Sequence, residues 1–89
     1  MNQPQFTLKE YLTVFNLVIS RGKKLNGYYH FNGVKAWHDF DGYTCFLGYK
    51  DLTLTLLFHG RHSYDYEQKE SLNTFCKLLT DILKDKMND

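Results

Sequence analysis

The 89-residue sequence contains one proline, two cysteines and almost no net charge. No low-complexity segment or linker divides it, so we expect one domain over residues 1–89. Cys45 and Cys76 stand 31 positions apart and cannot form the disulfide framework of a small secreted protein. Eleven Lys and Arg against ten Asp and Glu leave a formal charge of +1, which predicts no general attraction to nucleic acid or to an anionic membrane.

Long hydrophobic runs are also missing. No segment approaches the roughly 20 apolar residues that a membrane-spanning helix requires. The first residues, MNQPQFTLKEY, lack the basic region and the apolar stretch of a signal peptide. We therefore expect a cytoplasmic protein with no membrane partner.

Sequence motifs of common enzymes are absent as well. There is no GxSxG, no HExxH and no paired CxxC. All six glycines fall at the expected ends of helices and strands, where they suit turns and caps rather than a phosphate-binding loop. We expect a protein that is not an enzyme and that has no cofactor.

One Cys-His pair needs separate consideration. The expected hairpin places His38 opposite Cys45, and such a pair activates a thiolate only where the sulfur is accessible and the base is oriented. Cys45 lies mid-strand among apolar residues, and Cys76 lies on the apolar stripe of the second expected helix. We expect both thiols to be buried and inert, and we predict no catalytic residue.

Helical periodicity appears at both ends of the chain. Thr7 and Glu10 have the spacing of a capping box, and Gly22 is expected to end the helix in a left-handed conformation, so we predict a helix over about residues 7–21. A second apolar stripe predicts a helix over about residues 67–84. The two stripes consist of Leu8, Tyr11, Leu12, Phe15, Val18 and Ile19, and of Leu72, Phe75, Cys76, Leu79, Ile82 and Leu83.

Between the helices the period changes to that of β-strands. Asn32-Gly33 and Asp41-Gly42 are typical of two-residue hairpin turns. The expected strands cover about residues 27–31, 34–40, 43–48 and 52–59. The pattern predicts an α+β two-layer fold of helix, four-stranded antiparallel meander and helix, with both helices on one sheet face.

Strand alternation assigns the side chains to two faces. On the helix side we expect a row of Tyr29, Ala36, Leu47 and Leu52, beside Phe31, Val34, His38, Cys45, Leu54, Phe40, Tyr43 and Leu56. On the other face Tyr28, Trp37 and Phe46 align across three strands, with Thr53 next in line and Leu57 further along the last strand. Aromatic residues make up 17% of the chain, and three exposed rings would approach or pass the area that a monomer usually shows in one apolar patch.

Several explanations of this aromatic surface remain open. A strand bulge or the C-terminal tail would bury the rings without any function. Self-association as a homodimer, or binding of another protein, is the leading functional hypothesis, with Tyr28, Trp37, Phe46 and Leu57 as the interface. Stacking of single-stranded nucleic acid on the rings is an alternative, although the expected neighbouring charges, His30, Lys35, Asp39 and Asp51, are mixed rather than basic.

The densest polar segment is HGRHSYDYE, residues 59–67. His59 and His62 with Asp65 resemble part of a metal site but lack the fixed further ligands that zinc requires. Arg61 with the two histidines suits a small ligand or an anion. The structural alternative is a packed loop in which Gly60 turns the chain and the tyrosines cover the edge of the core.

The strings FDGYT, LTLTLLFH and YDY resemble those of a family of short bacterial cytosolic domains of unknown function. The resemblance runs from about Gly33 to Leu79. It implies a single-domain bacterial protein and brings no activity, cofactor or site residue.

Overall fold

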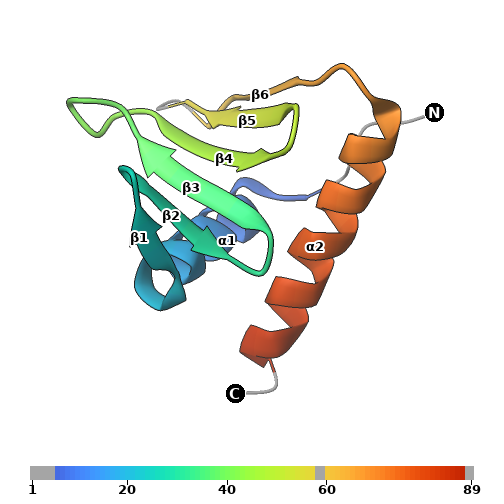
Figure 1. Ribbon diagram of the computed structural model, residues 1–89, viewed down its shortest axis with the longest axis horizontal. Helices are drawn as coiled ribbons and strands as arrows, with labels where there is room; N and C mark the ends of the chain where they lie inside the picture. Colours follow the sequence, from blue (N-terminus) through green and yellow to red (C-terminus); the bar gives the residue numbers. More distant parts are fainter. Residues whose placement is uncertain (1–5, 58–59, 88–89) are drawn as a thin grey trace.

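The computed structural model describes residues 6–57 and 60–87. The described chain forms one helix, six strands and a second helix (Figure 1). All strands join one antiparallel sheet in the order β1-β2-β3-β4-β5-β6. The bounds are α1 (Leu8–Arg21), β1 (Lys23–Leu25), β2 (Tyr28–Phe31), β3 (Val34–His38), β4 (Cys45–Tyr49), β5 (Leu52–Leu56), β6 (His62–Asp65) and α2 (Lys69–Met87).

The fold class is therefore α+β, as predicted, but the meander has six strands rather than four. The two additional strands, β1 and β6, are the edges of the sheet. All three residues of β1 are exposed, and β6 has only one residue that is half-buried. Neither segment shows the apolar alternation by which a strand is recognised in a sequence.

Helix α1 begins with the predicted capping box. The amide of Thr7 donates to Glu10 Oε1 over 2.8 Å, and the amide of Glu10 donates to Thr7 Oγ1 over 3.1 Å. Gly22 ends the helix in an extended conformation, with φ −80° and ψ 169°, rather than in the predicted left-handed one. A Cβ at Gly22 would lie 2.3 Å from the Val18 carbonyl oxygen and 2.7 Å from that of His30, so glycine is required here by close backbone approach.

The predicted Asn32-Gly33 hairpin is confirmed, since both residues have positive φ, 50° and 86°. Tyr29 pairs with Ala36, and Ala36 pairs with Leu47, as expected. Leu47 then pairs with Leu54 and not with Leu52. Strand β4 continues to Tyr49, so the turn has two residues where residues 49–51 were expected, and the register moves by two. A shift of two preserves the face of every side chain.

The predicted tight turn at Asp41-Gly42 is wrong. Strand β3 ends at His38, so residues 39–44 form a longer loop closed by a 3.0 Å bond from the Asp39 amide to the Thr44 carbonyl. The Asp39 side chain accepts hydrogen bonds from backbone amides within the loop and so competes with the β-ladder. Phe40 and Tyr43, expected in the core, are 106% and 65% exposed.

His38 pairs with Cys45 as predicted but is exposed rather than part of the core. Its Nδ1 lies 2.9 Å from the Asp39 carbonyl oxygen. Cys45 and Cys76 are half-buried, and burial raises the pKa of both thiols. A raised thiol pKa disfavours the thiolate that a Cys-His pair would need.

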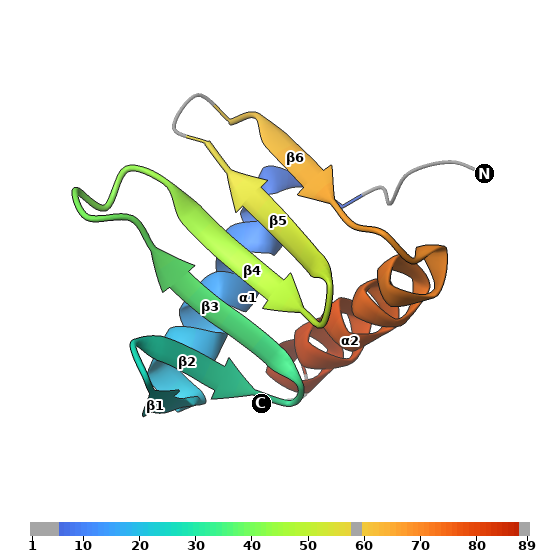
Figure 2. The ribbon, with the colours of Figure 1, turned by 45° about the horizontal axis from the view of Figure 1, so that its top comes forward.

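One buried cluster joins both helices to the central strands. In Figure 2, α1 crosses behind the strands and α2 runs beside the end of the sheet. Within the described part of the chain, neither helix is long and apolar enough to cross a membrane. The cluster consists of Tyr11, Val14, Phe15 and Val18 of α1, Val34, Ala36, Leu47, Leu52, Leu54 and Leu56 of the sheet, and Leu72, Phe75, Leu79 and Ile82 of α2.

Candidate functional site

Tyr28, Trp37 and Phe46 lie side by side on three neighbouring strands, and we call them the aromatic row. Trp37 pairs directly with Phe46, and the β2–β3 register places Tyr28 beside Trp37. Their neighbours Ala36 and Leu47 are buried in the core, so alternation directs the three rings to the opposite face. The β3–β4 register is unbroken, which contradicts the alternative of a bulge that returns Trp37 to the core.

The rings of the aromatic row contact one another. Tyr28 and Trp37 meet edge to face, with centroids 5.1 Å apart and planes at 87°. Trp37 and Phe46 are stacked, with centroids 5.2 Å apart and planes at 11°. Both geometries are favourable for aromatic pairs and hold the rings as one unit.

Gly48 provides the space for this arrangement. A Cβ at Gly48 would lie 2.9 Å from Trp37 Cζ3 and 3.1 Å from Cη2, so any side chain there would displace the indole. The sequence interpretation treated Gly48 as a turn glycine and missed this role. A glycine on the same strand face as Phe46, two residues away, was the available signal, because a strand glycine often marks close approach.

The apolar surface extends beyond the three rings. Tyr28 is 38% exposed, and its partner Leu25 on β1 is 59% exposed. Trp37 and Phe46 are half-buried, largely by each other. Leu57, which follows β5, is 41% exposed. Beyond Phe46 the row continues with Thr55 rather than the expected Thr53. At the C-terminal end, the residues through Met87 continue helix α2 and do not form a separate tail.

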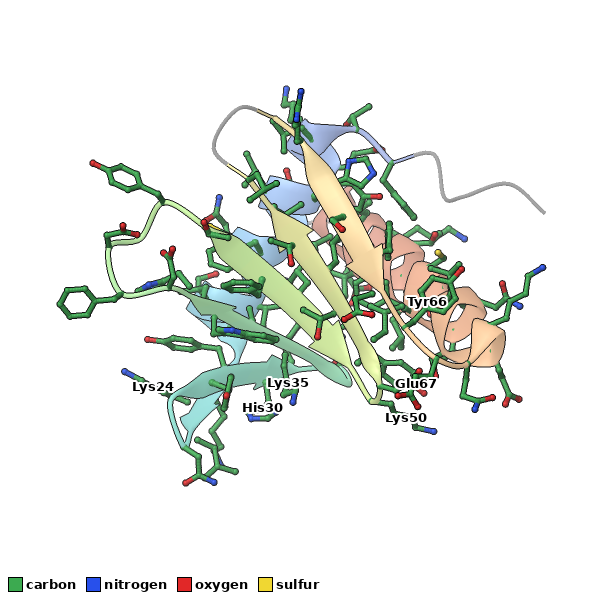
Figure 3. The ribbon with its side chains drawn as sticks, turned by 90° about the horizontal axis from the view of Figure 1, so that it is seen from above. Lys24, His30, Lys35, Lys50, Tyr66 and Glu67 are labelled. Atoms are coloured by element: carbon green, nitrogen blue, oxygen red, sulfur yellow. The ribbon has the colours of Figure 1, made fainter. Side chains whose placement is uncertain are left out.

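A second row on the same face is basic. Lys23 pairs with His30, and His30 pairs with Lys35, so the three side chains cross β1, β2 and β3 beside the aromatic row. We call Lys23, His30 and Lys35 the basic row. Lys35 Nζ also lies 5.2 Å from the centroid of Tyr28 and 5.8 Å from that of Trp37, within cation–π distance. Figure 3 shows His30 and Lys35 close together at this end of the sheet.

The acidic residues expected beside the rings serve other purposes. Asp39 organises the β3–β4 loop, and amide hydrogen bonds, above all from Thr44, lower its pKa. Asp51 follows Lys50 in the β4–β5 turn and accepts a hydrogen bond from the amide of Glu67; Figure 3 shows Lys50 and Glu67 away from His30 and Lys35. His30 and Lys35 lie beside the rings as predicted, the β1–β2 pairing adds Lys23, and Asp51 is bound near the start of α2.

Asp51 joins the β4–β5 turn to the start of α2. Its Oδ2 accepts from the amides of Glu67 (2.7 Å) and Gln68 (2.9 Å), and the Ser71 hydroxyl donates to Oδ1. These bonds, that of Ser71 first, lower the Asp51 pKa to about 2. The carboxylate thus satisfies free amides ahead of the helix, which is a structural role.

The polar segment 59–67 contains strand β6 rather than only a loop. His59 lies outside the described residues, and Arg61 and His62 are exposed. The His62 ring packs 5.2 Å from that of Tyr11, whereas Asp65, three residues further along the strand, lies on the other face. In residues 6–57 and 60–87 no three His, Cys, Asp or Glu side chains are grouped to hold a metal ion. A ligand site at His59, Arg61 and His62 stays a prediction.

The tyrosines of this segment contact the core. The hydroxyls of Tyr64 and Tyr11 are 2.9 Å apart, and the Tyr64 ring meets Phe75 edge to face at 6.2 Å. Burial raises the pKa of both tyrosines. Tyr66 also packs against the core cluster. These contacts agree with the structural alternative, in which the tyrosines cover the edge of the core.

A family model described as "Protein of unknown function (DUF3081)" matches residues 6–89. No curated protein and no solved structure matches the chain. The match contains FDGYT, LTLTLLFH and YDY, and it confirms the predicted resemblance to a domain of unknown function over a longer range than Gly33 to Leu79.

Proposed function

The chain belongs to the DUF3081 family, a family of unknown function, and since membership brings no activity, we propose a function from the sheet surface alone. The protein is a small interaction module rather than an enzyme. It associates with a second copy of itself through the face of the sheet that carries the aromatic row.

One-sided burial of the sheet supports this proposal. In β5, three leucines are buried while Thr53 and Thr55 are half-buried. The buried sheet residues share one core with residues from α1 and α2. We therefore place both helices on that face, which leaves the aromatic row without a helix over it.

The observation that carries the proposal is the exposure of apolar side chains along this uncovered face. Leu25, Tyr28 and Leu57 are 59%, 38% and 41% exposed. If each copy covers about 300 Å² of apolar surface, roughly 600 Å² in total gives a gross gain of about 15 kcal/mol. Association costs of about 4–15 kcal/mol leave a modest surplus, so we expect a dissociation constant in the micromolar range.

Sedimentation velocity of matched variants tests the proposal. Tyr28→Arg places a charge in the exposed part of the aromatic row and is expected to make the protein monomeric at tens of micromolar. Leu12→Ala, at a position on α1 with the similar exposure of 37%, is expected to remain dimeric. A Tyr28→Arg variant that sediments like wild type, with unchanged circular dichroism, contradicts the proposed surface.

Single-stranded nucleic acid is the second candidate, and the basic row favours it. A row of cations beside aromatic rings suits phosphates beside stacked bases. Against it, the Trp37 ring already stacks on Phe46 and has Lys35 Nζ within 5.8 Å, so an incoming base competes with existing contacts. Binding predicts quenching of Trp37 fluorescence by oligonucleotides, with affinity that falls as salt rises. No quenching at low salt removes this candidate.

A further inference from the structure

The loop between β3 and β4, residues 39–44, projects beyond the body of the sheet in Figures 1 and 2, and we call it the tip. It carries Phe40 at 106% exposure and Tyr43 at 65%. No other large hydrophobic side chain in the described part of the chain is as exposed. Two aromatic rings held in water at one end of a hairpin are typical of contact residues.

Hydrogen bonds hold the tip in a defined shape. Asp39 Oδ1 accepts from the amides of Gly42 (3.0 Å) and Thr44 (3.1 Å). Asp41 Oδ1 accepts from the amide of Tyr43 over 3.2 Å. An exposed aromatic residue on a preorganised loop loses little further entropy when it binds.

The tip is acidic, and the β1–β2 end of the face that carries the aromatic row is basic. Asp39 and Asp41 flank Phe40, and no Lys or Arg occurs between residues 36 and 49. The β1–β2 end carries the basic row together with exposed Leu25 and Tyr28. Each end therefore combines apolar side chains with charge, and the two charges are of opposite sign.

Symmetry allows both ends to be used at once. In a face-to-face dimer, a two-fold axis can run between the two faces, midway between the tip and the β1–β2 end. Rotation about this axis brings the tip of one copy over the β1–β2 end of the other. The tip of each copy then meets the basic end of the other, with Trp37 and Phe46 between the two contacts. Phosphate groups suit this face less well, because the carboxylates of the tip would repel them.

We infer that two copies of the chain associate face to face, with the acidic aromatic tip of each copy packed on the basic β1–β2 end of the other. This inference rests on the proposed self-association and specifies how the two copies are aligned, which we call the register of the dimer. Phe40 and Tyr43 contact Leu25 and Tyr28 of the second copy, while the aspartates lie near the basic row.

A charge-swap experiment tests the register by sedimentation. Asp41→Lys alone and Lys23→Asp alone each place like charges at both contacts of a homodimer, so each is expected to weaken it about tenfold. Mixing the two variants restores opposite charges at both contacts of the heterodimer, and we expect near wild-type affinity for the mixture. The difference should shrink in 1 M NaCl, because salt screens surface charges.

Two controls separate charge from shape. Asp41→Asn keeps an oxygen for the Tyr43 amide but removes the charge, so an intermediate loss of affinity is expected. Phe40→Ala should weaken the dimer at all salt concentrations without lowering the melting temperature measured where the protein is monomeric. The register is overturned if the mixture binds no better than either variant alone. If the wild type is nevertheless a dimer that Tyr28→Arg disrupts, the proposed function still stands. A monomeric wild type overturns both.

Discussion

The indole of Trp37 occupies the space above Gly48 on the next strand, where a Cβ would approach Cζ3 to 2.9 Å. Gly48→Ala is therefore expected to push the ring away from Phe46 and to destabilise the fold by about 1–3 kcal/mol. Denaturant unfolding measures the cost, and a red shift of Trp37 emission reports the displaced ring. In a Trp37→Leu background the same substitution should cost less, and an equal cost in both backgrounds would contradict the contact.

The lowered pKa of Asp51 predicts that the fold loses stability in acid. Folding lowers its pKa from 3.8 to about 2, so its contribution is complete above pH 4 and is lost as the pH falls towards 2. Asp51→Asn should lower the melting temperature at pH 6 and flatten its dependence on pH between 4 and 2. Asp81→Asn, on the exposed surface of α2, is the matched control. The account of Asp51 fails if the two variants have the same pH profile.

Phe40 and Phe75 provide a direct comparison of surface with core. Phe75 is fully buried, and Phe75→Ala should cost about 3–5 kcal/mol of unfolding free energy. Phe40→Ala should change it by less than about 0.5 kcal/mol, measured under conditions where the protein is monomeric. If Phe40→Ala lowered the unfolding free energy as much as Phe75→Ala, Phe40 would have to be buried in the core.

The Tyr11–Tyr64 hydrogen bond predicts an effect at alkaline pH. Burial raises the pKa of both hydroxyls above 10.0, so their contribution is complete below pH 10 and is lost as the pH rises beyond it. Tyr64→Phe leaves the Tyr11 hydroxyl without this partner and should cost about 1–3 kcal/mol at pH 7. Tyr28→Phe, which keeps the ring at a position 38% exposed, is the control in urea titrations under conditions where the protein is monomeric. Equal stability of the two variants would argue against the bond.

Alternation in the sequence predicts the face of a residue better than it predicts its partner. Leu52 was expected beside Leu47, and Leu54 occupies that place, yet both leucines are buried because a slip of two residues keeps the face. Trp37 and Phe46 pair as predicted, because the longer loop at residues 39–44 keeps the register that a two-residue turn at Asp41-Gly42 would have set. The candidate surface could thus be located from local information.

Other features depend on interactions that no periodicity encodes. The shape of the tip depends on the Asp39 carboxylate, which accepts hydrogen bonds from the amides of Gly42 and Thr44 within the loop. Strand β1 is at the edge of the sheet, pairs with only one neighbouring strand and is exposed along its length, so it needs no apolar alternation. The basic row arises from the β1–β2 pairing, and the contact of His62 with Tyr11 joins distant parts of the chain.

Sedimentation equilibrium of the wild-type protein from 1 to 200 μM is the most direct test of self-association through the aromatic face. We expect the apparent mass to rise from 10.6 kDa towards twice that value as concentration increases. Tyr28→Arg should hold the mass at that of the monomer over the whole range. A wild-type protein that stays at 10.6 kDa at 200 μM would contradict the account.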